Sequence, residues 1–221
     1  KESLRCGCEV FYELKRILSS KSFSTSVGDE GGFAPDIKSN NECLDLILKA
    51  INKAGYKEGK DVYIGLDVAS SEFYKNKKYK LAGENLELTS ESLIRYYENL
   101  INNYPIISIE DALDEGDWEG WTNLTNAIGN KCQLVGDDLF VTSDKRLQLG
   151  IDKKAGNSIL IKLNQIGTLS ETMDTINLAK KNNYNTIISH RSGETEDTFI
   201  ADLSVGVSSG QIKAGSLSRS E

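Results

Sequence analysis

Six short apolar stretches of this sequence each end on one residue that could take part in chemistry. The terminal residues are two aspartates, a glutamate, two lysines and the single histidine of the chain. In chain order they are Asp67, Glu110, Asp137, Lys162, His190 and Lys213. Carboxylates can hold a divalent cation, and a lysine or a histidine can transfer a proton. If the fold gathers these side chains at one place, they form an active site.

The three acids are suitable ligands for a magnesium ion. Mg2+ prefers hard oxygen ligands at about 2.0–2.1 Å in an octahedral shell that water and substrate complete. Asp67, Glu110 and Asp137 would repel one another strongly if they met without a cation. Any one of them alone is more often a solvated strand end. Their repetition on three successive stretches therefore favours a metal site.

The basic residues leave two interpretations open on position alone. Lys162 follows the very apolar run SILI. It is either a strand end whose ammonium reaches water or a base kept neutral by neighbouring cations. A lone histidine at a strand end, such as His190, is more often structural than catalytic. Arg191 next to it carries a planar fork of donors that matches phosphate or carboxylate.

The elements that carry these residues follow a repeating pattern. The six stretches have the length of buried parallel strands, and helical patterns lie between most of them. They occupy residues 61–67, 106–110, 133–137, 158–162, 186–190 and 211–213. Helices are predicted at 2–19, around 44–51, and near 89–103, 118–128, 143–155, 168–182 and 195–209. This order predicts one α/β domain with the TIM-type (β/α)8 barrel fold, in which the carboxyl ends of the strands meet on the catalytic face.

Alternation within the first stretch agrees with a barrel. Ile64 and Leu66 lie on one face of the predicted strand, and Gly65 and Asp67 lie on the other. The aliphatic face would pack on helices, so the carboxylate of Asp67 would point into the mouth of the barrel.

Composition excludes several classes of protein. The chain has 221 residues with 26 basic and 33 acidic side chains, a formal charge of −7, and its basic residues are dispersed, which argues against a nucleic-acid partner. No apolar stretch approaches the ~20 residues of a membrane span, and the first residues lack the apolar core of a signal peptide. The four cysteines form no CxxC pair. We therefore expect a cytoplasmic protein with unpaired thiols and no membrane partner.

Longer segments of the chain resemble the enolase family. They are VGDEGGFAPDI (27–37), IGLDVASSEFY (64–74), SIEDALDEGDW (108–118), LVGDDL (134–139), IKLNQIGTLSET (161–172), SHRSGETEDTFIADL (189–203) and GQIKAGSLSRSE (210–221). KLNQIGTLSE and SHRSGETEDT are the most specific to that family. The resemblance extends over the whole chain.

The resemblance implies roles for individual residues. It implies that Asp67, Glu110 and Asp137 bind the high-affinity Mg2+. It implies that Lys162 is the base that removes the C2 proton of the substrate, and that Glu30 is the acid that helps the C3 hydroxyl leave.

Substrate binding is implied in the same way. The residues that correspond to the family's substrate-binding positions are Glu110, Asp137, Lys162, Ser189, His190, Arg191, Ser192 and Lys213. The family also implies two Mg2+ ions per active site of the complete enzyme, a small phosphorylated substrate and a homodimer.

The activity implied by the family is that of the glycolytic phosphopyruvate hydratase, which reversibly dehydrates 2-phospho-D-glycerate to phosphoenolpyruvate. The C2 proton is barely acidic, because its removal puts further charge on an anionic carboxylate. Cations on that carboxylate stabilise the ene-diolate, and each stabilisation of about 1.36 kcal/mol is worth about tenfold in rate. A lysine or histidine base used together with Mg2+ is a general feature of the enolase superfamily.

The sequence departs from the family pattern at a few points. Ala112 stands where the family usually has proline, and Ser216 where alanine is commoner. Neither residue is a ligand, so we expect these two departures to adjust the activity rather than abolish it. Against the family order ββαα(βα)6, residues 1–221 would lack the N-terminal α+β domain, the first two barrel strands and the last helix. Such a partial barrel is expected to be weakly active or inactive.

Two other functions are compatible with parts of the pattern. Another enzyme of the superfamily, such as a racemase or a lactonising enzyme, would share the three acids and the barrel. It would lack the SHRSGETEDT segment and the acid of GDEGG. A binding or surface protein derived from an enolase would have no need of catalysis, but intact Glu30, Lys162 and Lys213 argue against decay of the site.

Overall fold

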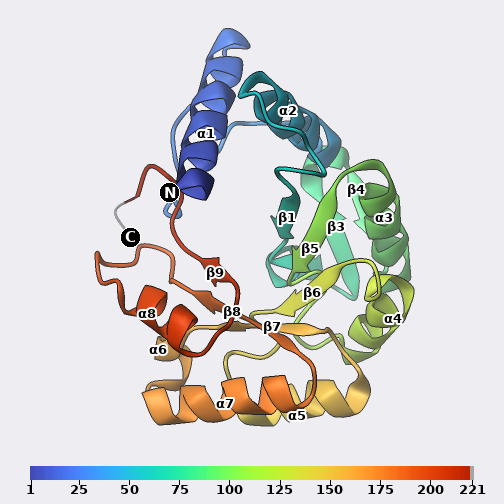
Figure 1. The fold of residues 1–221 in the computed structure, drawn as a ribbon. Coiled ribbons are helices and arrows are strands. Elements are labelled where there is room, and N and C mark those ends of the chain that lie inside the picture. The colour runs from blue at the N-terminus through green and yellow to red at the C-terminus, as the bar shows by residue number, and fades with distance from the viewer. Residues whose placement is uncertain (220–221) are drawn as a thin grey trace.

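A computed structural model describes residues 1–219 of the chain. Its centre is a curled six-stranded sheet in the order β1-β5-β6-β7-β8-β9 (Figure 1). Every neighbouring pair in this sheet is parallel. The strands are β1 (Ile64–Asp67), β5 (Ile106–Glu110), β6 (Gln133–Gly136), β7 (Ser158–Ile161), β8 (Asn185–Ser189) and β9 (Ile212–Lys213). The fold is therefore the predicted α/β type, an incomplete TIM barrel.

Helices cover the outside of this sheet. They are α1 (Glu2–Ser20), α2 (Asn40–Lys53), α3 (Ser90–Asn103), α4 (Trp118–Ile128), α5 (Asp144–Lys153), α6 (Leu163–Ile166), α7 (Leu169–Lys181) and α8 (Phe199–Gly206). Figure 1 shows α3, α4, α5 and α7 on the outer side of the curl, and α1 and α2 together near its open side. Four of the helices begin at a residue whose hydroxyl accepts a backbone N–H, a cap worth about 1 kcal/mol each. These residues are Ser39, Thr89, Ser143 and Thr168.

Several parts of the fold differ from the prediction. The short helix α6 was not expected, because the nearest predicted helix began at residue 168. The last helix is shorter than 195–209, because the Asp197 carboxylate accepts the N–H of Phe199 at 2.8 Å and α8 begins there. The sequence analysis also missed a small antiparallel sheet made of β2 (Tyr74–Lys75), β3 (Lys78–Leu81) and β4 (Leu86–Leu88). Its first turn has positive φ angles at both Asn76 and Lys77, as a two-residue hairpin requires.

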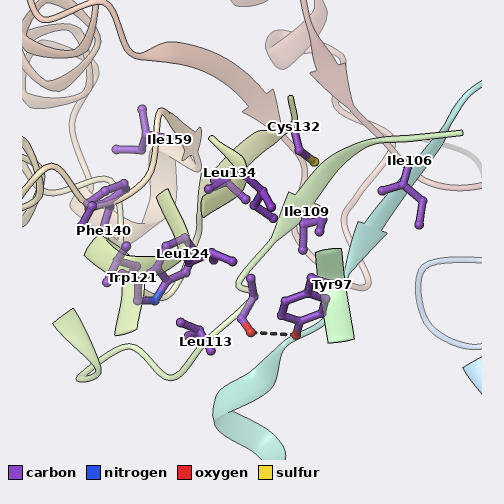
Figure 2. Packing of buried hydrophobic residues seen from close by; sticks show 14 of the residues in the cluster. Tyr97, Ile106, Ile109, Leu113, Trp121, Leu124, Cys132, Leu134, Phe140 and Ile159 are labelled. Atoms are coloured by element: carbon purple, nitrogen blue, oxygen red, sulfur yellow. Dashed lines mark hydrogen bonds between the residues drawn. The ribbon is translucent and has the colours of Figure 1, made fainter. Parts of the chain in front are cut away.

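The main core lies between the sheet and its outer helices. Figure 2 shows Trp121 and Leu124 of α4 packed near Ile109 and Leu134 of neighbouring strands. The hydroxyl of Tyr97 donates a hydrogen bond to the Ala112 carbonyl at 2.8 Å, which fixes the chain immediately after β5 (Figure 2). Burial of each large aliphatic side chain contributes about 1.5–3 kcal/mol.

The loop after β6 packs closely onto this core through Phe140. A Cβ atom on Gly136 would lie 2.5 Å from the Phe140 ring, and one on Gly150 would lie 2.4 Å from it. Glycine at these two positions lets the ring lie between β6 and α5. The loop that carries Asp137 is thereby held down on the core.

Bulk features agree with several expectations. Ile64 and Leu66 contribute to the main core, as their alternation predicted. All four thiols are free, with Cys132 buried and the others half-buried. No helix within residues 1–219 has the length and apolar character that crossing a bilayer needs.

Candidate active site

The carboxyl ends of β1, β5 and β6 bring the three predicted acids to one edge of the sheet. Asp67 and Glu110 are register partners across the β1–β5 ladder. Glu110 is in turn the register partner of Val135, so Asp137, the residue that follows β6, lies just beyond this level. The Glu110 and Asp137 side chains are only 9% and 12% exposed, whereas that of Asp67 is 41% exposed.

Lys213, at the end of β9, reaches across to two of these acids. Its Nζ lies 2.7 Å from Oδ2 of Asp67 and 2.8 Å from Oε1 of Glu110. Burial, helped by the charge of Asp67, raises the pKa of Glu110 to about 8, although Lys213 opposes the shift. Burial alone would lower the pKa of Lys213, but the two carboxylates outweigh it and the pKa is raised. A positive charge is thus held between the two carboxylates.

Lys162 makes the corresponding contact with the third acid. Its Nζ lies 2.5 Å from Oδ2 of Asp137, and the amide of Gln165 donates to the other oxygen of that carboxylate at 3.3 Å. The Gln165 carbonyl oxygen accepts from the Thr142 hydroxyl at 2.7 Å, and the same hydroxyl accepts the backbone N–H of Lys162 at 2.9 Å. These contacts fix the orientation of the Asp137 carboxylate relative to Lys162.

A second set of carboxylates lies close enough to share a cation. Oxygen atoms of Asp111, Asp137 and Asp138 lie within 4.8 Å of one another. The two oxygens of Asp111 already accept the backbone N–H groups of Asp137 and Asp138, each at 2.9 Å. Asp137 belongs to both acid sets, so it would be a ligand in either of them.

The end of β8 supplies the predicted anion-binding residues. Ser189 and His190 are buried, and the His190 N–H donates to the Lys213 carbonyl at 3.0 Å. The Arg191 guanidinium donates to Oδ1 of Asn164 at 3.1 Å. A cavity of about 310 Å³ has Asn164, Ser189 and Arg191 among its lining residues. Donors for a phosphate or carboxylate therefore line this cavity.

Glu30 reaches the same edge from the glycine-rich loop between α1 and α2. Its carboxylate accepts the Ser192 hydroxyl at 3.0 Å, and its carbonyl accepts the Ser216 N–H at 2.8 Å. Gly31 has φ +83°, and a Cβ there would lie 2.6 Å from the Arg219 side chain, so only glycine fits without a shift. Within residues 1–219, no direct hydrogen bond joins Glu30 to Lys162.

A larger cavity, of about 580 Å³, lies along the free edge of β1. Its lining is mostly apolar and comes in part from α2 and α3. Asp67 is the one predicted site residue among the residues that line this cavity.

Comparison with known families gives the same assignment as the geometry. The model of the enolase C-terminal TIM barrel domain matches residues 1–221. The chain belongs to this enolase family. It therefore has the fold of an enolase-superfamily lyase, with its polar and charged residues at the catalytic face of the barrel.

The carboxylates of this enolase domain fit a divalent cation. Asp67, Glu110 and Asp137 offer only hard oxygen donors, which is the ligand type of Mg2+. Two lysine ammonium groups already lie against these carboxylates, so the positions favour positive charge. Of the two acid sets, the one formed by Asp67, Glu110 and Asp137 accepts only side-chain donors within residues 1–219. We therefore favour it for the ligands.

Three residues of this enolase site escaped the sequence analysis: Asp111, Thr142 and Gln165. Gln165 lies inside the family segment 161–172, which could have signalled it. Asp111 likewise lies inside the family segment 108–118, whereas Thr142 lies outside all the quoted segments. Asp111 and Thr142 have positive φ angles of 43° and 55°, which no sequence pattern shows.

Proposed function

We propose that the complete protein to which this domain belongs carries out the reversible dehydration of 2-phospho-D-glycerate to phosphoenolpyruvate, the reaction of a phosphopyruvate hydratase (EC 4.2.1.11). The observation that carries the proposal is the pairing of Lys162 with Asp137, beside Glu110 and Lys213, at the carboxyl edge of the sheet. A lysine held against a carboxylate that can bind Mg2+ is what proton abstraction next to a substrate carboxylate needs.

Asp67, Glu110 and Asp137 would hold the Mg2+ ion. When bound, this ion supplies positive charge that stabilises the carboxylate as it gains electrons. Lys213 adds a fixed ammonium next to two of these acids. Ser189 and Arg191 would donate hydrogen bonds to the substrate's anionic groups from beside the small cavity.

Proton transfer falls to two residues on different elements. Lys162, in its neutral form, takes the C2 proton onto Nζ, and the electron pair of that bond passes into the substrate carboxylate to give an ene-diolate, whose electrons then form the C2=C3 double bond. The C3–O bond breaks, and Glu30 gives its proton to the leaving hydroxyl, which departs as water. The Ser192 hydroxyl at 3.0 Å holds the Glu30 carboxylate at the site edge. The reverse sequence hydrates the product.

The experiment that tests this function is conversion of 2-phosphoglycerate by the complete protein with Mg2+. Formation of phosphoenolpyruvate, lost in the Lys162→Ala variant, is the expected result. Racemisation of a 2-hydroxy acid without loss of water would instead place the protein among other enzymes of the superfamily. We further propose that the complete protein is cytoplasmic and that it forms a homodimer. Sedimentation at rising concentration would test the homodimer.

A further inference from the structure

Asp111 is a buried carboxylate that the proposed reaction does not use. It follows Glu110 directly, and only 5% of the residue is exposed. Its φ angle is 43°, in the left-handed region that aspartate adopts more readily than most residues. Such a conformation is strained and persists only where the surroundings determine it.

The backbone of Asp111 ties two neighbouring strands to β5. Its N–H donates to the Val135 carbonyl of β6 at 3.0 Å. Its carbonyl accepts the N–H of Ser70 at 3.1 Å, three residues beyond Asp67 at the end of β1. The three strands that end in Asp67, Glu110 and Asp137 therefore meet at this one residue.

The side chain of Asp111 binds the backbone that follows β6. One carboxylate oxygen accepts the N–H of Asp137, and the other accepts the N–H of Asp138, each at 2.9 Å. Hydrogen bonds from backbone N–H groups to a carboxylate are among the stronger ones in proteins. Both bonds fix the backbone on which the Asp137 carboxylate is mounted.

We propose that Asp111 is a positioning residue, which sets the Asp137 backbone so that Asp137 and Glu110 can bind the same Mg2+ ion. The proposal rests on the proposed magnesium site. Each oxygen of Asp111 already accepts a backbone N–H, so this carboxylate is directed at the Asp137–Asp138 backbone. Residues behind a ligand of this kind typically change metal affinity by about 10–100-fold when replaced.

Asparagine is the substitution that isolates this role. It keeps the size of aspartate and its tolerance of positive φ. Its single carbonyl oxygen can accept from only one of the two backbone N–H groups, and its amide nitrogen would face the other as a second donor. Asp111→Asn should therefore loosen the Asp137–Asp138 backbone with the strand ladder intact.

Asp117 provides a matched control. It also accepts a backbone N–H, that of Gly120 at 3.0 Å, as well as the hydroxyls of Ser90 and Tyr79. It caps the start of α4, and within residues 1–219 its side chain forms no hydrogen bond with any of the three proposed ligands. Asp117→Asn should thus lower stability by a similar route and leave the Mg2+ site untouched.

The test measures Mg2+ affinity by calorimetry, unfolding by urea, and amide exchange at residues 137 and 138 by NMR. We expect Asp111→Asn to weaken Mg2+ binding about tenfold and to speed exchange at one of the two amides, whereas Asp117→Asn changes neither. A folded Asp111→Asn protein with unchanged affinity and exchange would overturn the proposal. Absence of Mg2+ binding by the wild-type protein would instead overturn the magnesium site itself, and the positioning role with it.

A wild-type measurement covers the case in which Asp111→Asn does not fold. The Asp137 and Asp138 amides should then exchange at least about 100-fold more slowly than the amide of Gly193, which lies in an exposed loop. Exchange of both at the loop rate would show that the carboxylate does not hold this backbone, and would overturn the proposal.

Discussion

The ammonium of Lys213 lies 2.8 Å from the Glu110 carboxylate, across the opening between the last and second strands of the sheet order. The Lys213 side chain is 25% exposed and that of Glu110 is 9% exposed. An ion pair this deep resists screening by salt, and loss of one partner leaves the other charge buried without compensation.

Replacement of Lys213 by methionine should destabilise the protein by about 2 kcal/mol at about pH 9, where Glu110 is ionised as well as Asp67. This is less than the ~3–5 kcal/mol of a fully buried pair, because Asp67 keeps contact with water. Urea unfolding in a metal-free buffer measures the effect. The control is Lys80→Met, since Lys80 pairs with Glu87 at 2.8 Å but both side chains are 49% exposed. That change should cost less than about 1 kcal/mol, and equal losses in the two variants would contradict the argument.

The raised pKa of Glu110 predicts a pH dependence. Burial and Asp67 raise this pKa to about 8, so the native state keeps a proton that the unfolded chain releases near pH 4.3, roughly the ordinary value. The stabilisation of the native state by this bound proton is complete below about pH 4 and is lost as the pH rises through about 8. Without Mg2+, the free energy of unfolding should therefore fall over this window, and Glu110→Gln should flatten the fall.

Mg2+ should reverse this trend, because the cation binds the ionised carboxylate. Binding at neutral pH should release protons, and the apparent affinity should rise with pH up to about 8. Calorimetry in two buffers with different heats of ionisation measures the number of protons released. Binding without proton release at pH 7 would show that Glu110 is already ionised or is not a ligand.

The positions of the site residues were largely predictable from the sequence, and their contacts were not. Asp67 and Glu110 end apolar runs, and period-two alternation together with parallel strand order is enough to place them at one edge. That Lys213 pairs with Asp67 and Lys162 with Asp137 depends on side-chain reach across the curl, which no local pattern shows.

The elements that escaped prediction depend on backbone angles. The hairpin between β2 and β3 turns at Asn76-Lys77, without the glycine that usually marks such a turn. The loop before α8 is polar and contains a helix-like spacing, but the Asp197 carboxylate stops the helix from starting earlier than Phe199. In both places, one or two residues give a local structure that differs from the one that the surrounding sequence pattern predicts.

Self-association is expected because β1 and β9 are the edge strands of the sheet. An exposed strand edge offers unpaired N–H and C=O groups to another chain. The edge of β1 also borders the apolar cavity of about 580 Å³. Sedimentation velocity of residues 1–221 should show association that grows with concentration.

A lysine placed next to this edge should reduce the association. Tyr63 precedes β1 and is 46% exposed, so Tyr63→Lys adds a charge there with little effect on the core. The control is Tyr12→Lys on α1, where the residue is 61% exposed. Equal association of both variants and the wild type would show that the β1 edge is not the contact.

Lys162→Ala and Glu30→Gln should separate the two halves of the proposed reaction in the complete protein. If Lys162 takes the C2 proton first, its loss should abolish exchange of that proton with solvent deuterium. Glu30→Gln should keep the exchange and stop the loss of water, because the ene-diolate still forms but the hydroxyl lacks a proton donor. NMR of 2-phosphoglycerate in deuterated buffer follows the exchange, and phosphoenolpyruvate formation reports the second half.

Ser192→Ala serves as a third variant. The Ser192 hydroxyl holds Glu30 at 3.0 Å, so its removal should affect only the loss of water. Exchange that survives in Lys162→Ala and vanishes in Glu30→Gln would mean that the base and the acid are reversed. Loss of both activities in both variants would indicate a shared structural role in place of separate proton transfers.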